Sequence, residues 1–165
     1  MKLVAVVLLA IAPVDTARPY LTPDGWGPVR IGMSRAEVEA VMGTPLEGEA
    51  INDEYSCIEM TPADSDLGVW FMFEEYKLSR ILIAEPSKVR TPRGIGIGAS
   101  AKAVRRAYGR GLKAEPHFYA GLPSEYLTYW TKPGERGVRF ETDSRRRVQA
   151  IHAGGDSIQY VEGCA

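Results

Sequence analysis

The chain has 165 residues, a length that a single domain commonly takes. It is 45% hydrophobic and 25% charged, which is typical of a globular protein and too apolar for a disordered one. The formal net charge of −1 gives no basic excess for nucleic acid or an anionic membrane, and two Cys and two His leave little material for metal or cysteine chemistry.

The first residues have the pattern of a secretory signal peptide. A positive start at Lys2 is followed by an apolar run and then by Pro13. The run is too short to span a bilayer, which takes about 20 residues. No Cys lies near residues 12–25, so a lipid anchor of the bacterial lipoprotein kind has no attachment point there. We therefore predict a signal peptide over residues 1–17, export to the periplasm or out of the cell, no lipid anchor and no transmembrane segment.

An internal repeat at an offset of 66 residues organises the rest of the chain. The segments that hold Ser34 and Ser100 align, and each is followed by apolar residues spaced as on one face of a helix. The two serines are suited to cap helix N-termini, and Gly43 and Gly109 are suited to end the helices in the left-handed conformation. Both halves are therefore predicted to open with a short amphipathic helix.

Three runs of strand character follow each predicted helix. Those of the first half cover residues 55–60, 68–74 and 78–84, and those of the second cover 125–131, 137–142 and 147–153. We predict an α+β fold in which two tandem units, each a helix plus a three-stranded antiparallel meander, share one sheet with both helices on one face. Residues 18–165 would form a single domain of two repeats, about 20–85 and 88–165.

The opening of the first unit resembles a known family. The segment 27–34, the helix after it and Gly43-Thr44-Pro45 look like the helical opening of the β-lactamase-inhibitor-protein-like superfamily, and the small outer-membrane lipoprotein family SmpA/OmlA has a similar opening. The resemblance implies a helix-on-sheet fold that presents a surface to another protein. The chain lacks the anchoring Cys of the lipoproteins and has too few Cys for the two bridges of the inhibitors.

The two cysteines, Cys57 and Cys164, are candidates for a disulfide. Oxidising compartments favour pairing, and export would bring the chain into one. In the chain-entropy model, closing a loop of this size stabilises a protein by about 4–5 kcal/mol. The alternative is two separate free thiols.

Signals for catalysis or cofactors are weak. Gly96-Ile97-Gly98-Ala99-Ser100-Ala101 fits the dinucleotide fingerprint, but no buried strand precedes it and the equivalent first-half segment lacks the glycines. His117 and His152 lie far apart, without metal-ligand spacing, and no G-x-S-x-G motif is present. We predict no catalytic residue, no metal and no cofactor. A small hydrolase that uses His117 or His152 stays open, as does a binder of a small ligand in a cleft between the units.

The two halves carry opposite charge. Residues 18–83 hold 5 basic and 12 acidic side chains, net −7, whereas residues 84–165 hold 14 basic and 8 acidic ones, net +6. Either the halves neutralise each other locally, or the protein presents a dipolar surface that orients a charged partner. The basic runs are not interleaved with stacking aromatic residues, so we expect no nucleic-acid partner.

Strand alternation predicts a binding face. If Val69, Phe71 and Phe73 face the core, the residues between them face the other way. The resulting open sheet face would carry Trp70, Met72, Arg139 and one of two neighbours on another strand, Tyr129 or Trp130, either of which could point outward. This composition suits protein interfaces. We therefore predict an exported, non-enzymatic interaction module, an inhibitor or an envelope-assembly accessory, whose partner is another envelope or secreted protein. The alternative is that a loop covers these residues or that they form a second small core.

Overall fold

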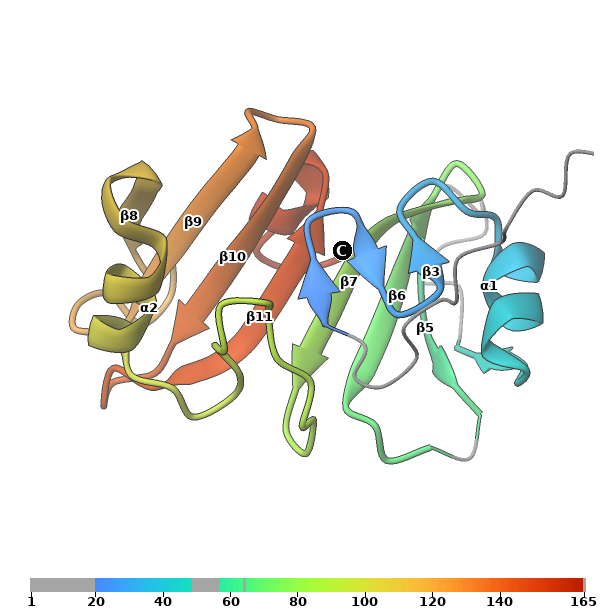
Figure 1. Cartoon of the computed structure of the whole chain (residues 1–165), viewed down its shortest axis with the longest axis horizontal. Helices are drawn as coiled ribbons and strands as arrows, with labels where there is room; N and C mark the ends of the chain where they lie inside the picture. The colour runs from blue at the N-terminus through green and yellow to red at the C-terminus, as the bar shows by residue number, and fades with distance from the viewer. Residues whose placement is uncertain (1–19, 49–56, 64, 165) are drawn as a thin grey trace, which may run out of the picture.

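The computed structural model describes residues 20–48, 57–63 and 65–164, and this part of the chain builds two antiparallel β-sheets (Figure 1). The small sheet has the order β1-β2-β3, with β1 (Leu21–Thr22), β2 (Gly25–Trp26) and β3 (Val29–Arg30). Gly25 has a φ of 153°, and a Cβ there would lie 2.0 Å from the carbonyl oxygen of Val29, so this tight pairing requires glycine.

The large sheet has eight strands in the order β4-β5-β6-β7-β11-β10-β9-β8. They are β4 (Leu46–Glu47), β5 (Cys57–Pro62), β6 (Val69–Glu74), β7 (Lys77–Ala84), β8 (Leu112–Pro116), β9 (Glu125–Lys132), β10 (Arg136–Thr142) and β11 (Val148–Gly154). The two halves of the chain meet at the centre, where β7 and β11 pair antiparallel with Ile83 opposite Ile151. The six longer strands lie within two residues of the strand-like runs read from the sequence.

The helices begin where the sequence predicts. Ser34 caps α1 (Arg35–Met42), and its hydroxyl and backbone N–H form a reciprocal capping box with Glu37. Ser100 caps α2 (Ala101–Tyr108) by accepting a hydrogen bond from the third helical N–H. Both predicted N-caps are confirmed.

The helix ends differ from each other. Gly43 ends α1 in the left-handed conformation, with φ 70° and ψ 17°, as predicted. The same prediction for Gly109 is wrong: its ψ is −144°, and the chain continues into a 3₁₀ turn, η1 (Gly109–Gly111), that leads into β8.

One face of the large sheet carries the apolar core. Both helices and the small sheet lie in front of this face in Figure 1. Fully buried side chains from the central strands, Phe71, Ile81, Phe140 and Ile151, join one hydrophobic cluster with residues of the helices and of the small sheet. This cluster therefore runs through both halves of the chain.

The predicted α+β architecture of two helix-plus-three-strand units is wrong. The described chain is mostly β, with α-helices of only eight residues each and with a three-stranded sheet beside an eight-stranded one. The difference arises in segments that the prediction left irregular: residues 21–30 pair among themselves, and β4 and β8 extend the edges of the large sheet. Backbone N–H and C=O groups find partners in this way, and hydropathy patterns do not report such pairing.

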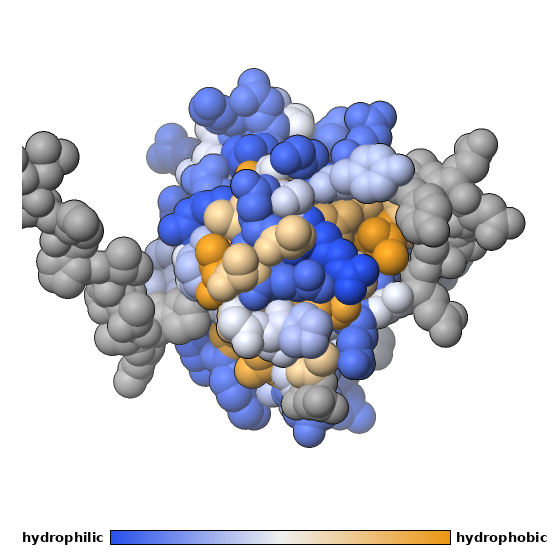
Figure 2. Space-filling model, turned by 90° about the vertical axis from the view of Figure 1, so that its right-hand side faces the viewer, coloured by the Kyte–Doolittle hydropathy of each residue, from blue (hydrophilic) through white to orange (hydrophobic). Residues whose placement is uncertain are grey.

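The predicted signal peptide, residues 1–17, lies outside the described residues. Within the described ranges, no helix is both long and apolar enough to cross a membrane. Figure 2 shows the end of the molecule that carries α1, where hydrophobic residues lie in small groups between hydrophilic ones.

Candidate functional site

The face of the large sheet opposite the helices carries charged and polar side chains. Because side chains alternate along a strand, Arg80 on β7, Arg139 and Glu141 on β10, and His152 on β11 point away from the apolar core. The 3₁₀ turn η2 (Asp156–Gln159) contacts β7, β10 and β11 and covers part of this face. The part of the polar face that holds Arg80, Arg139 and His152 is therefore buried rather than open.

The five predicted binding residues do not share one open surface. Met72 is 1% exposed and Arg139 is 6% exposed, so the expected exposure of these two side chains is wrong. Trp70, Tyr129 and Trp130 are half-buried, and Tyr129 packs against α2 on the helix face. The covering segment at η2 comes from a distant part of the sequence, which alternation along a strand cannot reveal.

Arg80 joins three parts of the polar face. Its side chain is only 2% exposed, and its Nη2 donates to Oε1 of Glu59 on β5 at 2.5 Å. Its Nη1 donates to the carbonyl oxygens of Ser157 at 3.0 Å and Tyr160 at 3.3 Å. A buried guanidinium needs such partners, because an unpaired buried charge is strongly unfavourable. Arg80 thus holds the C-terminal segment on the sheet.

The disulfide fixes the same segment from its other end. Cys57 on β5 and Cys164 are bonded across 107 residues, as predicted from the sequence. The C-terminal segment from η2 to Cys164 is therefore attached to the sheet at two places. A disulfide fits a protein that matures in an oxidising compartment.

His117 orders the loop between β8 and β9. Its Nδ1 accepts hydrogen bonds from the backbone N–H groups of Tyr119 and Ala120, both at 3.2 Å. The acceptor role of Nδ1 places the ring proton on Nε2, which lies 3.0 Å from Oε1 of Glu141 and donates to it. The imidazole also stacks on Tyr126, with ring centroids 4.7 Å apart. One side chain thus connects the loop to β9 and β10.

Glu141 is the central anion of this network. Its Oε2 lies 3.5 Å from Nε2 of His152, and its Oε1 also accepts a hydrogen bond from Gln149 at 2.6 Å. The hydrogen bond from His152, followed by those from His117 and Gln149, lowers the pKa of Glu141 to about 2 against the opposing effect of burial. Burial lowers the pKa of His152, so its imidazole is neutral at pH 7.

Arg139 lies buried beside this network. Its guanidinium carbon is 4.0 Å from the centroid of the Tyr126 ring, and its Nη1 lies 3.4 Å from Glu115 and 3.3 Å from the Thr128 hydroxyl. Burial lowers the pKa of Arg139, with Glu115 opposing the shift. The guanidinium of Arg139 is therefore engaged by groups of the fold itself.

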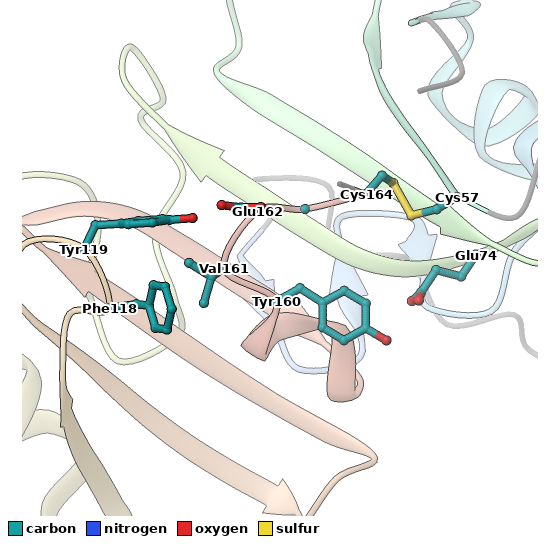
Figure 3. A pocket seen from close by; sticks show the side chains of 9 residues that line it. Cys57, Glu74, Phe118, Tyr119, Tyr160, Val161, Glu162 and Cys164 are labelled. Atoms are coloured by element: carbon teal, nitrogen blue, oxygen red, sulfur yellow. A yellow bond between two sulfur atoms is a disulfide. The ribbon is translucent and has the colours of Figure 1, made fainter. Parts of the chain in front are cut away.

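A pocket of about 540 Å³ opens between the two segments that the polar face holds. Figure 3 shows Phe118 and Tyr119 of the β8–β9 loop on one side, Tyr160 and Glu74 on the other, and Val161 between them. The Cys57–Cys164 disulfide lies at its rim. We call this hollow the aromatic pocket; its lining residues are Cys57, Glu74, Phe118, Tyr119, Tyr160, Val161, Glu162, Gly163 and Cys164.

The walls of the aromatic pocket expose large apolar side chains. Phe118 is 71% exposed and Tyr119 is 63% exposed, and the two rings contact each other edge to face at 5.0 Å. Tyr160 and Val161 are also exposed. Grouped exposed aromatic residues on an otherwise polar surface are typical of interaction sites.

The charged groups of the aromatic pocket are carboxylates, those of Glu74 and Glu162. Neither forms an ion pair with a residue in the described ranges. Burial, and secondly the carboxylate of Glu74, raises the pKa of Tyr160. The pocket thus combines aromatic rings with two carboxylates that are in no ion pair, and Glu74 shares a hydrogen bond with Tyr160.

The two histidines do not form a hydrolytic site with the aromatic pocket. Neither lines the pocket, and both direct Nε2 to the same carboxylate of Glu141. Both ring nitrogens of His117 are engaged, so it has no free position to accept a proton from a nucleophile. Among the residues that the structure describes, no three His, Cys, Asp or Glu side chains gather as metal ligands.

Sequence reasoning missed the residues that build this pocket. Phe118 and Tyr119 stand outside the predicted helices and strands, beside Gly121, and large aromatic side chains in such a segment are a usable signal of exposure. The pairing of Arg80 with carbonyl groups about 80 residues away has no counterpart in the local sequence.

Comparisons with known proteins inform only on the fold. No family model matches the chain, and a search among curated proteins finds no match. The structure is similar to that of an extracellular protein containing a SCP domain from Bacillus anthracis str. Ames, with a TM-score of 0.53 at 12% sequence identity. The alignment covers 92% of this chain and 50% of that one, so the chain spans about half the length of its structural neighbour.

Proposed function

We propose that the protein is an exported, non-enzymatic interaction module that binds a segment of another exported protein in the aromatic pocket. The observation that carries the proposal is the exposure of Phe118, Tyr119 and Tyr160 around a hollow whose walls are anchored to the sheet. Walls whose backbone is anchored lose little conformational freedom on binding, which favours affinity.

The polar face supports this proposal because it holds both walls. His117 fixes the loop of Phe118 and Tyr119, and Arg80 with the disulfide fixes the segment of Tyr160. The aromatic side chains that these segments expose to solvent have no evident role within the fold.

The remaining properties agree with a binding module. The predicted signal peptide and the disulfide favour a periplasmic or secreted location. The resemblance to the β-lactamase-inhibitor-protein-like superfamily, which implies a surface offered to another protein, favours the same function. We place the binding surface at the aromatic pocket instead of the sheet face, because Met72 and Arg139 are buried there.

A selection of random peptides displayed on phage tests the proposal. Peptides are selected on the mature, disulfide-bonded protein and then assayed on the variant Phe118→Ala/Tyr119→Ala. We expect enriched peptides to lose at least about tenfold in affinity for this variant, because exposed aromatic anchors dominate interface energies.

Tyr76→Ala is the matched control. Tyr76 is 70% exposed and Phe118 is 71% exposed, but Tyr76 lines a different hollow beside α1. Peptide binding should be unchanged in this variant, and the circular dichroism of all variants should match that of the parent. Peptides that bind the Phe118→Ala/Tyr119→Ala variant as well as the parent would contradict the proposal.

A further inference from the structure

We infer that the aromatic pocket selects basic segments, taking a lysine or arginine side chain of the partner between its aromatic rings and its carboxylates. This inference rests on the proposed function and names the chemistry of the partner. It draws on three features of the pocket: its charge, its ring faces and its size.

The charge of the pocket has one sign. Glu74 and Glu162 line it, and neither has a cationic partner within the described chain. Asp156 lies near enough to contribute to the raised pKa of Tyr160. Of the neighbouring cations, Arg80 is almost fully buried and is already paired with Glu59. Lys77, opposite Glu74 in the β6–β7 register, forms no ion pair with it. A basic side chain would therefore find two carboxylates that no ion pair within the described chain engages.

The position of the pocket explains this charge. It forms where β5 and β6 of the acidic first half meet the C-terminal segment, so Cys57, Glu74 and Glu162 line the same hollow. The second half is basic as a whole, but its arginines do not line this hollow. The division of charge between the halves thus leaves an acidic site at one place on the surface.

The rings add a preference for cations over neutral apolar groups. Phe118, Tyr119 and Tyr160 stand around the same hollow as the carboxylates. An ammonium or guanidinium group over an aromatic face is stabilised by the ring quadrupole, and the alkyl stem of lysine or arginine packs on apolar surface such as Val161. An acidic segment would meet repulsion at the same place.

The size of the pocket suits a short segment. Its volume of about 540 Å³ falls within the range of about 300–1,000 Å³ that small-ligand sites occupy, so it accommodates one or two side chains. A basic segment of an exported protein is the occupant that we propose, and its lysine or arginine would be the anchor.

Three synthetic pentapeptides test the inference. They carry lysine, glutamine or glutamate on both sides of a central phenylalanine and are otherwise identical. Binding to the mature protein is followed by amide chemical shifts in ¹⁵N spectra. We expect the lysine peptide to bind at least about tenfold more tightly than the glutamine peptide, with shifts around Phe118 and Tyr160, and the glutamate peptide not to bind.

Two variants assign the effect to the pocket. Glu74→Gln/Glu162→Gln should bring the affinity for the lysine peptide down to that for the glutamine peptide. Glu135→Gln, which neutralises an exposed carboxylate in the turn between β9 and β10, should leave the affinity unchanged. Added salt should weaken binding of the lysine peptide and leave that of the glutamine peptide unaffected.

The possible failures are distinct from failure of the proposed function. Equal binding of the lysine and glutamine peptides, or equal loss in the Glu135→Gln control, would overturn the basic preference. If selected phage peptides depend on Phe118 but lack basic residues, the pocket binds proteins and the basic preference is wrong. If no peptide of either experiment depends on Phe118, the proposed function fails as well.

Discussion

The face of the large sheet that carries the helices is covered by apolar side chains, whereas the opposite face is covered through ion pairs and hydrogen bonds. On the helix face, Phe71, Phe140 and Ile151 are fully buried within one hydrophobic cluster. On the polar face, Arg80 and Glu141 each join groups that are far apart in sequence. The helix face thus supplies the apolar core, and the polar face connects segments that are distant in sequence.

The difference between the two faces explains how the segments that form the aromatic pocket are held in place. Apolar burial is non-directional and scales with the area removed from water, so it stabilises without fixing one atom against another. A buried charge requires partners at particular positions. The contacts of Arg80 and His117 therefore fix where the C-terminal segment and the β8–β9 loop lie, and these segments form the aromatic pocket.

The largest effect is expected from a cavity in the apolar face. Phe71→Ala should lower the free energy of unfolding by about 4 kcal/mol, because a fully buried ring is lost and its space is only partly refilled. Urea denaturation measures this loss. Peptide binding by the fraction that stays folded should not change. A loss below about 1 kcal/mol would contradict the assignment of Phe71 to the core.

On the polar face we expect a smaller loss in the free energy of unfolding but a larger loss in peptide affinity. Arg80→Met should lower the free energy of unfolding by about 3 kcal/mol, because Glu59 and the carbonyl groups of Ser157 and Tyr160 each lose the hydrogen bond from Arg80. The double variant Glu59→Gln/Arg80→Met should recover part of this loss. Urea denaturation of both variants and peptide titration at the aromatic pocket provide the measurements. Unchanged peptide affinity in Arg80→Met would show that Arg80 does not position Tyr160.

The smallest effect is a dependence on pH that belongs to the polar face. The pKa of Glu141 falls from 4.5 to about 2 on folding, so its contribution is complete above about pH 4.5 and declines as the pH falls. The expected loss is about 2 kcal/mol at about pH 3. The lowered pKa of His152 acts in the same direction, because the unfolded chain takes up a proton as the pH falls below about 6.5.

Denaturation at several pH values tests this dependence. Glu141→Gln should flatten the acid branch of the stability curve, whereas Phe71→Ala should shift the whole curve without changing its slope. An acid branch of equal slope in Glu141→Gln would locate the titrating group elsewhere in the molecule.

The features that could be predicted from the sequence are those with local causes. The caps at Ser34 and Ser100 depend on contacts within one helical turn, and strand alternation depends on neighbouring residues. The Cys57–Cys164 pairing was accessible because the chain has only two cysteines.

The features that could not be predicted from the sequence depend on contacts between distant segments. Strand alternation correctly predicts that Arg139 points to the face opposite Val138 and Phe140. It does not predict that other segments cover that face. The fold class was wrong for a related reason, since the pairing of β4 and β8 with the sheet edges leaves little trace in short segments. The aromatic pocket required both kinds of information, because its walls come from the β8–β9 loop and the C-terminal segment.

The bond between Cys57 and Cys164 imposes an order on biosynthesis. Its two sulfur atoms are separated by 107 residues, and Arg80 finds its carbonyl partners 77 and 80 residues later in the chain. The residues of β5, β6 and β7 are therefore synthesised long before those of the segment that covers their polar face. In that interval Arg80 lacks two of its acceptors and Cys57 is a free thiol open to other partners. Correct oxidation thus depends on keeping this nascent surface unpaired until the chain can close over it.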